Sequence, residues 1–86
     1  MNKYEKILFE NQSSEGIKEN SIKEAKCIAN ILKINQFLGE FNSKRKTLLR
    51  YAERCKYIID TNQDREQFKT KNWYIEFSNL YNILRQ

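Results

Sequence analysis

Apolar positions follow a helical period through the middle of the chain. Their spacing of three or four residues predicts an amphipathic helix over residues 22–33. The positions are Ile22, Ala25, Ile28, Ala29 and Leu32. Ser21 and Glu24 fit a capping box, in which the two side chains satisfy backbone N–H groups of the first turn, so the helix is expected to start beside Ser21.

A second apolar series follows directly, at Ile34, Phe37, Leu38 and Phe41. Asn35 lies close to the junction of the two series and could break or cap a helix there. One reading is a helix of 22–33 followed by a shorter segment. The other is a single helix over 22–41, and the sequence leaves both open.

The clearest helix is expected over residues 44–57, with Ser43 as its N-cap. At 3.6 residues per turn, its apolar side chains fall on one stripe. They are Leu48, Ala52, Cys55 and Ile59. A second stripe, Lys46, Arg50 and Arg54, lies roughly 170° away by the same geometry. The sequence thus predicts a core side and a cationic side.

The spacing of apolar residues changes from about residue 57. Residues 57–60 are aromatic and β-branched, and Trp73, Ile75 and Phe77 alternate with polar neighbours, so both segments are predicted as strands. The polar residues 61–72 would join them as a hairpin, and Ser78 would cap a short last helix. Residues 3–10 are ambiguous but lean to a strand, and residues 11–20 are predicted as a loop.

These elements together predict one α+β domain over residues 1–86. The expected architecture is a small winged helix-turn-helix, with two or three helices followed by a β-hairpin wing and a short C-terminal helix. A chain of 86 residues has room for one core but not for a deep substrate cavity as well.

Positive charge is concentrated in one segment. The net charge is +5, and residues 1–42 and 57–86 are each neutral. The whole excess lies in residues 43–56, where six basic side chains face Glu53 alone. A local positive field of this kind is typical of a protein with a polyanionic partner.

The cationic stripe could also be an ordinary solvated face. Two features favour nucleic acid instead. Acidic partners at a spacing of four residues are almost lacking, and Lys44, Arg45 and Lys46 crowd the first turn, where cations oppose the helix dipole. A phosphate bound at that turn would reverse the unfavourable interaction.

The predicted DNA-binding residues fall in two groups. Those on the helix are Ser43, Lys44, Arg45, Lys46, Thr47, Arg50, Tyr51 and Arg54. Those at the hairpin tip are Arg65, Lys69, Lys71 and Asn72. The first group would contact phosphates and a base edge, and the second would enter a minor groove. Thr47 and Tyr51 could equally be boundary packing, and the loop could be solvated.

No catalytic chemistry is predicted. The chain has no histidine and no glycine-rich phosphate loop, and Cys27 and Cys55 alone cannot complete a zinc site. We therefore expect neither enzyme activity, nor a metal, nor a cofactor. The sequence shows no membrane span and no signal peptide, and two cysteines fit a reducing compartment, so a cytoplasmic protein is expected.

Three segments resemble winged helix-turn-helix proteins of mobile elements, of the excisionase or plasmid relaxosome accessory type. They are SIKEAKCIANIL, KTLLRYAERCKYIID and NWYIEFSNLYNIL. The resemblance implies a sequence-specific accessory or regulatory protein of a plasmid, phage or conjugative element. It would bind double-stranded DNA as a homodimer, alone or within a larger nucleoprotein complex. The alternatives are a small protein-binding inhibitor or adaptor with a basic surface, and an RNA binder.

Overall fold

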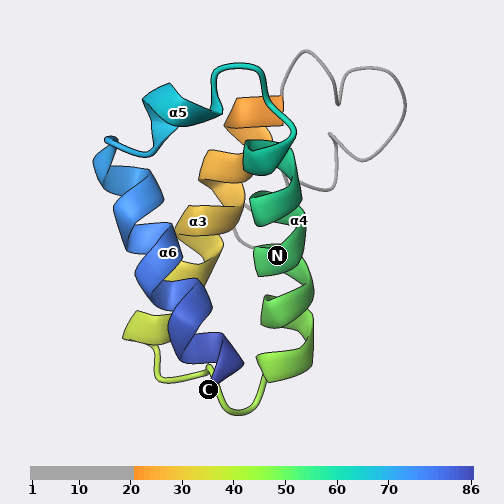
Figure 1. Cartoon of the computed structure of the whole chain (residues 1–86). Helices are drawn as coiled ribbons and strands as arrows, with labels where there is room; N and C mark the ends of the chain where they lie inside the picture. The colour runs from red at the N-terminus through yellow and green to blue at the C-terminus, as the bar shows by residue number, and fades with distance from the viewer. Residues whose placement is uncertain (1–20) are drawn as a thin grey trace.

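The computed structural model describes residues 21–86, which form helices and turns (Figure 1). The helices are α3 (Ser21–Phe37), α4 (Arg45–Asp60), α5 (Arg65–Phe68) and α6 (Asn72–Arg85). The strand predicted at 3–10 and the loop predicted at 11–20 lie outside the described residues. Within residues 21–86 there is no strand, so the predicted α+β class is wrong for this part of the chain.

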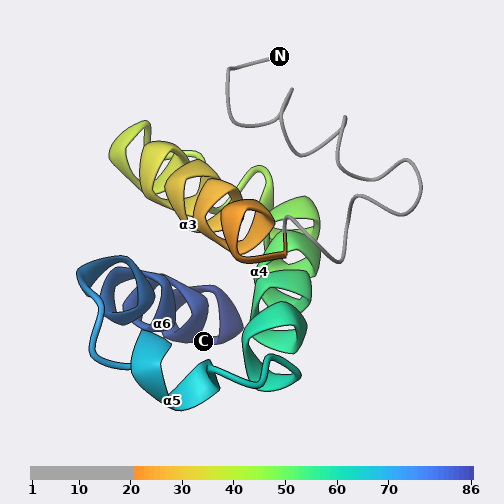
Figure 2. The same cartoon turned by 90° about the horizontal axis from the view of Figure 1, so that it is seen from above.

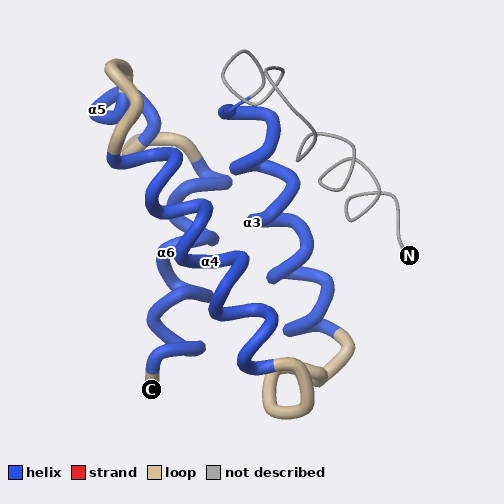
Figure 3. Tube along the Cα trace, turned by 90° about the vertical axis from the view of Figure 1, so that its right-hand side faces the viewer, coloured by secondary structure: helices blue, strands red, loops and turns tan. Residues whose placement is uncertain are grey.

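The three long helices form a small bundle. α3 and α6 run in one direction and α4 runs in the other, while α5 is a single turn between α4 and α6 (Figures 1 and 3). Seen from above, α6 lies against both α3 and α4 (Figure 2), and each of the three pairs is in contact. This arrangement buries one apolar stripe of every long helix.

The core lies along the axis of the bundle. Its largest fully buried apolar side chains are Ile28, Ile31 and Leu32 from α3, Leu48 and Ile59 from α4, and Leu84 from α6. Ala25 and Ala52 are also fully buried, and their small side chains allow helices to approach closely. The predicted stripe of α4 is confirmed, because all four of its members are buried.

α3 is longer than the helix predicted over 22–33 and shorter than the alternative of 22–41. Asn35 does not break it: the Asn35 Nδ2 donates to the Ile31 carbonyl oxygen at 2.8 Å inside the helix. The helix ends instead at Gly39, whose φ of 72° suits a residue without a side chain. The Glu40 N–H donates to the Asn35 carbonyl and the Gly39 N–H to the Gln36 carbonyl, which is the Schellman arrangement.

α4 starts and ends later than predicted. Its N-cap residue is Lys44, which has no side-chain capping bond, and the Ser43 hydroxyl donates to the Glu40 carbonyl oxygen instead. The predicted N-cap at Ser43 is therefore wrong. The predicted strand at 57–60 is wrong too, because these residues continue the helix and bury Ile58 and Ile59. Strand propensity is weak compared with burial of an apolar stripe.

The second predicted strand, residues 73–77, is the start of α6. Alternation would place Ile75 beside Trp73 and Phe77, but Ile75 is 48% exposed. The side chains that pack inward are Trp73, Phe77, Leu80 and Leu84, spaced by three or four residues. The alternation of three apolar residues fits a strand, but Trp73 and Phe77 also continue the helical spacing of the last helix back to residue 73.

The polar segment 61–72 is not a hairpin tip. The Thr61 hydroxyl donates to the Tyr57 carbonyl oxygen at 2.7 Å, and the Asp64 N–H donates to the Asn62 Oδ1 at 2.9 Å. The α5 turn follows, and its Phe68 ring lies 6.2 Å from the Trp73 ring. The segment therefore connects two helices, and the described residues contain no wing.

Both cysteines are buried and free. Burial raises the pKa of the Cys27 thiol and raises that of Cys55 further, so neither is a reactive thiolate. No helix of the described chain combines the length and the apolar character that crossing a membrane requires.

Candidate nucleic-acid interface

Most cations of residues 43–56 have partners in the fold. Lys44 Nζ lies 2.8 Å from Glu40 Oε2, and Lys56 Nζ lies 2.6 Å from Asp60 Oδ2. Arg45 is half-buried and donates to the Gln86 carbonyl oxygen, which joins the start of α4 to the end of α6. Fewer cations of this segment are therefore available to a ligand than its net charge suggests.

Arg54 is the clearest departure from the prediction. Its Nε lies 2.5 Å from Glu24 Oε1 and its Nη2 lies 3.3 Å from Glu24 Oε2. The Glu24 side chain is completely buried, whereas that of Arg54 is 36% exposed. The expectation that Arg54 belongs to an unpaired cationic stripe is thus wrong, because α3 supplies a carboxylate that the spacing within α4 could not reveal.

Lys46 and Arg50 remain on the surface, one turn apart on the side of α4 away from the core. Within the described residues, neither has an ion-pair partner. Glu53 and Tyr57 continue the same side, and Tyr57 is 65% exposed. We call these four residues the outer face of α4. It combines two free cations with one aromatic ring and one carboxylate.

The other predicted helix residues divide between surface and core. Thr47 is exposed beside Lys46, where its hydroxyl is accessible. Tyr51 is half-buried and packs against the core cluster, as boundary packing requires. Ser43 is exposed in the turn before α4. Of these three, Thr47 alone adjoins the outer face of α4.

The predicted loop residues lie at the other end of the bundle. Lys69 Nζ and Arg65 Nε lie 3.1 and 4.0 Å from Glu66 Oε1. Lys71 and Asn72 are exposed at the start of α6. α4 has 16 residues and is about 24 Å long, so these residues are far from Lys46. The structure does not bring the two predicted groups together (Figure 1).

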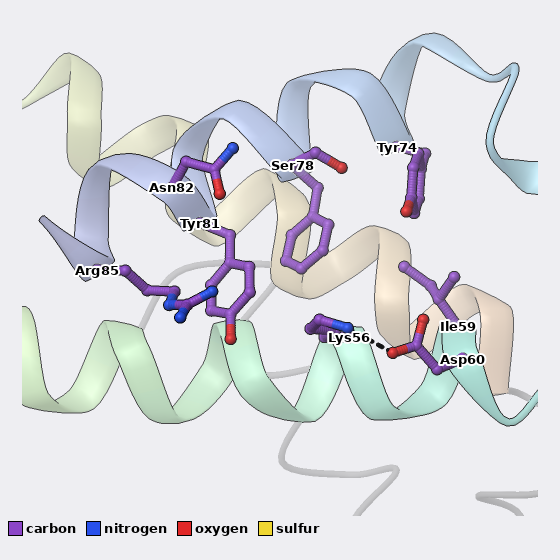
Figure 4. Close-up of a pocket in the computed structure, with 9 residues that line it drawn as sticks. Lys56, Ile59, Asp60, Tyr74, Ser78, Tyr81, Asn82 and Arg85 are labelled. Atoms are coloured by element: carbon purple, nitrogen blue, oxygen red, sulfur yellow. Dashed lines mark hydrogen bonds and ion pairs between the residues drawn. The ribbon is translucent and has the colours of Figure 1, made fainter.

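A groove between α4 and α6 was not predicted. It has a volume of about 180 Å³, and Figure 4 shows the polar side chains that line it. α4 contributes Lys56 and Asp60, and α6 contributes Tyr74, Ser78, Tyr81, Asn82 and Arg85. The Arg85 guanidinium carbon lies 5.4 Å from the centre of the Tyr81 ring. The hydrogen bond to Asp60 raises the pKa of Lys56 above its ordinary value.

The sequence did carry a signal for this groove. Tyr74, Ser78, Tyr81 and Arg85 follow one another at intervals of four, three and four residues, which places them on one side of a helix. The signal was hidden by the prediction of a strand at 73–77. In a strand over residues 73–77, Tyr74 would lie outside the helix that carries Tyr81 and Arg85.

A second groove, about 310 Å³ in volume, lies between α3 and α6. Lys33 Nζ lies 3.3 Å from Glu76 Oε2 in its lining, so its charges cancel. Within the described residues, no three histidine, cysteine or acidic side chains gather closely enough to hold a metal ion. The α4–α6 groove differs from it because Arg85 adds a positive charge beyond the Lys56–Asp60 pair.

No protein-family model, no curated protein and no solved structure matches this chain significantly.

Proposed function

We propose that this protein binds double-stranded DNA through the outer face of α4. The observation that carries the proposal is that Lys46 and Arg50 are exposed together, without carboxylate partners in the described part of the chain. Phosphate oxygens are the ligands that such cations bind on a nucleic acid.

The overall charge supports the same partner. Residues 21–86 carry thirteen basic and seven acidic side chains, a net charge of +6. A surplus of this size attracts a polyanion over a distance of about 8–10 Å at moderate salt and raises the rate of encounter.

The position of α4 supports a duplex. α4 contacts both α3 and α6 (Figure 2), whereas the residues of its outer face are exposed. A helix with side chains is about 10–12 Å across, and the major groove of B-DNA is about 12 Å wide. Thr47 and Tyr57 flank the two cations and can reach phosphate oxygens or base edges.

The proposal does not extend to a mobile-element role. The resemblance to winged helix-turn-helix proteins used residues 57–60 and 73–77 as wing strands, and both segments are helical. A homodimer and a larger nucleoprotein complex stay predictions from the sequence.

The test is binding of a labelled random-sequence duplex by the full chain at low salt. We expect Lys46→Gln/Arg50→Gln to weaken binding at least tenfold. Lys23→Gln/Lys33→Gln, which removes the same charge from α3, should weaken it less than threefold. Glu53→Gln, which removes the carboxylate from the outer face of α4, should strengthen binding. Equal losses in the two double variants would contradict the proposal.

A protein partner is the second candidate. Phe37 is 89% exposed and Leu38 is 58% exposed at the end of α3, and adjacent exposed apolar side chains are typical of protein contacts. Absence of duplex binding by the wild-type chain at low salt, combined with capture of an acidic protein, favours this candidate. Competition between duplex DNA and structured RNA separates the DNA proposal from an RNA one.

A further inference from the structure

The α4–α6 groove holds hydrogen-bond donors that the described part of the protein leaves unused. The hydroxyls of Tyr74, Ser78 and Tyr81 form no hydrogen bond to another described residue. The Asn82 amide is also without such a bond. Neighbouring groups of this kind on one face of a helix can bind the same ligand.

The donors are held in place by packing. The Tyr81 ring stacks on the Phe77 ring with centres 5.9 Å apart and planes only 6° from parallel. Phe77 is 2% exposed, so the ring beneath Tyr81 belongs to the core. The Tyr81 hydroxyl thus starts from a fixed position, and little conformational entropy is lost when a ligand accepts its hydrogen bond.

The charge of the groove is positive. Lys56 and Asp60 neutralise each other through their hydrogen bond, which is drawn in Figure 4. Arg85 has no ion-pair partner among the described residues and lies beside Tyr81 in the lining of the groove (Figure 4). The α3–α6 groove is the useful comparison, because its lysine and glutamate cancel without leaving a further cation.

An anion with several acceptor oxygens fits this set of donors. Arginine and hydroxyl groups are common partners of phosphate oxygens. The volume of about 180 Å³ is below the roughly 300–1,000 Å³ of pockets for drug-sized ligands. The groove therefore suits a single phosphate with part of its sugar better than a large metabolite.

The α6 side of the groove ends with Arg85 near the start of α4, whereas the α4 side is formed by Lys56, Ile59 and Asp60 near the end of that helix. Arg45, at the start of α4, donates to the Gln86 carbonyl oxygen at the end of α6, so Arg85 and Lys46 lie at the same end of the bundle. A nucleic acid in contact with Lys46 therefore lies at the end of the bundle that carries Arg85.

We propose that the α4–α6 groove binds a backbone phosphate of the nucleic acid that lies along the outer face of α4. Arg85 is the ion-pair partner of that phosphate, and the Tyr81 hydroxyl beside it donates a hydrogen bond to one of its oxygens. This inference rests on the proposed function and adds a second contact region to it.

The first arm of the test uses duplex binding over a range of salt concentrations. We expect Arg85→Gln to weaken binding about tenfold. The slope of the logarithm of the binding constant against the logarithm of salt concentration should become shallower by about 0.9, which corresponds to the loss of one phosphate contact. Tyr81→Phe keeps the stacked ring and should weaken binding about threefold. Arg65→Gln removes an exposed arginine at the opposite end and should leave affinity within twofold.

The second arm uses inorganic phosphate and NMR of the wild-type chain without duplex. We expect a saturable shift of the Arg85 Nε–H and Tyr81 ring signals at millimolar phosphate, and loss of the shift in Arg85→Gln. Asp60→Asn removes the one carboxylate of the groove and should tighten phosphate binding about threefold.

The outcomes separate the two proposals. If Arg85→Gln behaves like Arg65→Gln while Lys46→Gln/Arg50→Gln loses binding, the groove assignment is overturned and the proposed function stands. A phosphate shift with unchanged duplex binding assigns the groove to free phosphate and also overturns the nucleic-acid contact. Absence of any saturable phosphate shift overturns the site itself. A wild-type chain that does not bind duplex overturns the proposed function and this assignment together.

Discussion

At the scale of single residues, the Glu24–Arg54 pair determines which cations are available. The Glu24 carboxylate is fully buried, and Arg54 compensates its charge across the α3–α4 contact. The partners are 30 positions apart, so only the tertiary structure brings them together. Arg54 therefore has a structural task, whereas Arg50, one turn earlier, is exposed.

Replacement of Arg54 should destabilise the fold. We expect Arg54→Met to lower the free energy of unfolding by about 3 kcal/mol, because a buried carboxylate is left without its counter-charge. The control Arg50→Met should change it by less than about 0.5 kcal/mol. Urea unfolding followed by circular dichroism measures both. The double variant Glu24→Leu/Arg54→Met should recover most of the loss, and equal stabilities of the two single variants would contradict the role of the pair.

Cys55 should make stability fall at alkaline pH. Burial raises the pKa of this thiol above its ordinary value of 9.0 in the folded chain, so the folded state keeps its proton while the unfolded state loses it. The contribution is complete below about pH 8.5 and is lost as pH rises above it, by up to about 1.4 kcal/mol per pH unit.

The measurement for Cys55 is urea unfolding at pH 8 and pH 10 for the wild type and Cys55→Ala. We expect the wild type to lose about 1.5 kcal/mol more than the variant between the two pH values. Identical losses would show that the Cys55 thiol titrates alike in both states. The comparison of differences removes the effects of lysine and tyrosine titration, which the two proteins share.

At the scale of elements, the start of α6 distinguishes the observed helix from the predicted strand. In a strand, Ile75 would share the buried face of Trp73 and Phe77. In α6, Ile75 is 48% exposed while Phe77 is 2% exposed. Ile75 would therefore contribute strongly to stability in the strand but contributes little in the helix.

Alanine substitutions at these two positions test the element directly. We expect Phe77→Ala to cost about 3–5 kcal/mol of unfolding free energy, because it removes a buried ring. Ile75→Ala should lower the free energy of unfolding by less than about 0.5 kcal/mol, because alanine favours a helix and the half-exposed Ile75 side chain buries little apolar surface. A cost for Ile75→Ala close to that of Phe77→Ala would support the strand. Thermal and urea unfolding give both values.

Much of the helical core could be predicted from the sequence. The apolar stripe of α4 and the apolar positions of α3 were found from their spacing, since period alone specifies which side of a helix is buried. Gly39 was also readable as a helix end, because glycine is common just after a helix.

The rest failed for identifiable physical reasons. β-branched residues at 57–60 suggested a strand, but Ile58 and Ile59 complete the buried side of α4. For the candidate site, Lys46 and Arg50 could be predicted because exposure follows from the helical period. The ion pair of Arg54 with Glu24 and the groove between α4 and α6 could not be predicted, since both depend on how separate helices pack.

At the scale of the whole molecule, two features favour a binding protein. The described residues carry a surplus of positive charge, and Lys46, Arg50 and Arg85, which have no ion-pair partner among them, lie on α4 and at the end of α6. The other predicted basic region, in residues 61–72, lies at the opposite end of the bundle from Lys46 and Arg85 and is partly neutralised by Glu66. The outer face of α4 and the end of α6 are therefore the side that we propose for a polyanion.

The most direct measurement is the salt dependence of duplex binding for the wild-type chain and Lys46→Gln/Arg50→Gln. With three to five phosphates neutralised, we expect the logarithm of the wild-type binding constant to fall against the logarithm of salt concentration with a slope of about −3 to −5. The double variant should be shallower by about 2, one unit for each lost cation. A wild-type slope near zero, or the same slope in both proteins, would contradict the central claim that the outer face of α4 binds phosphates.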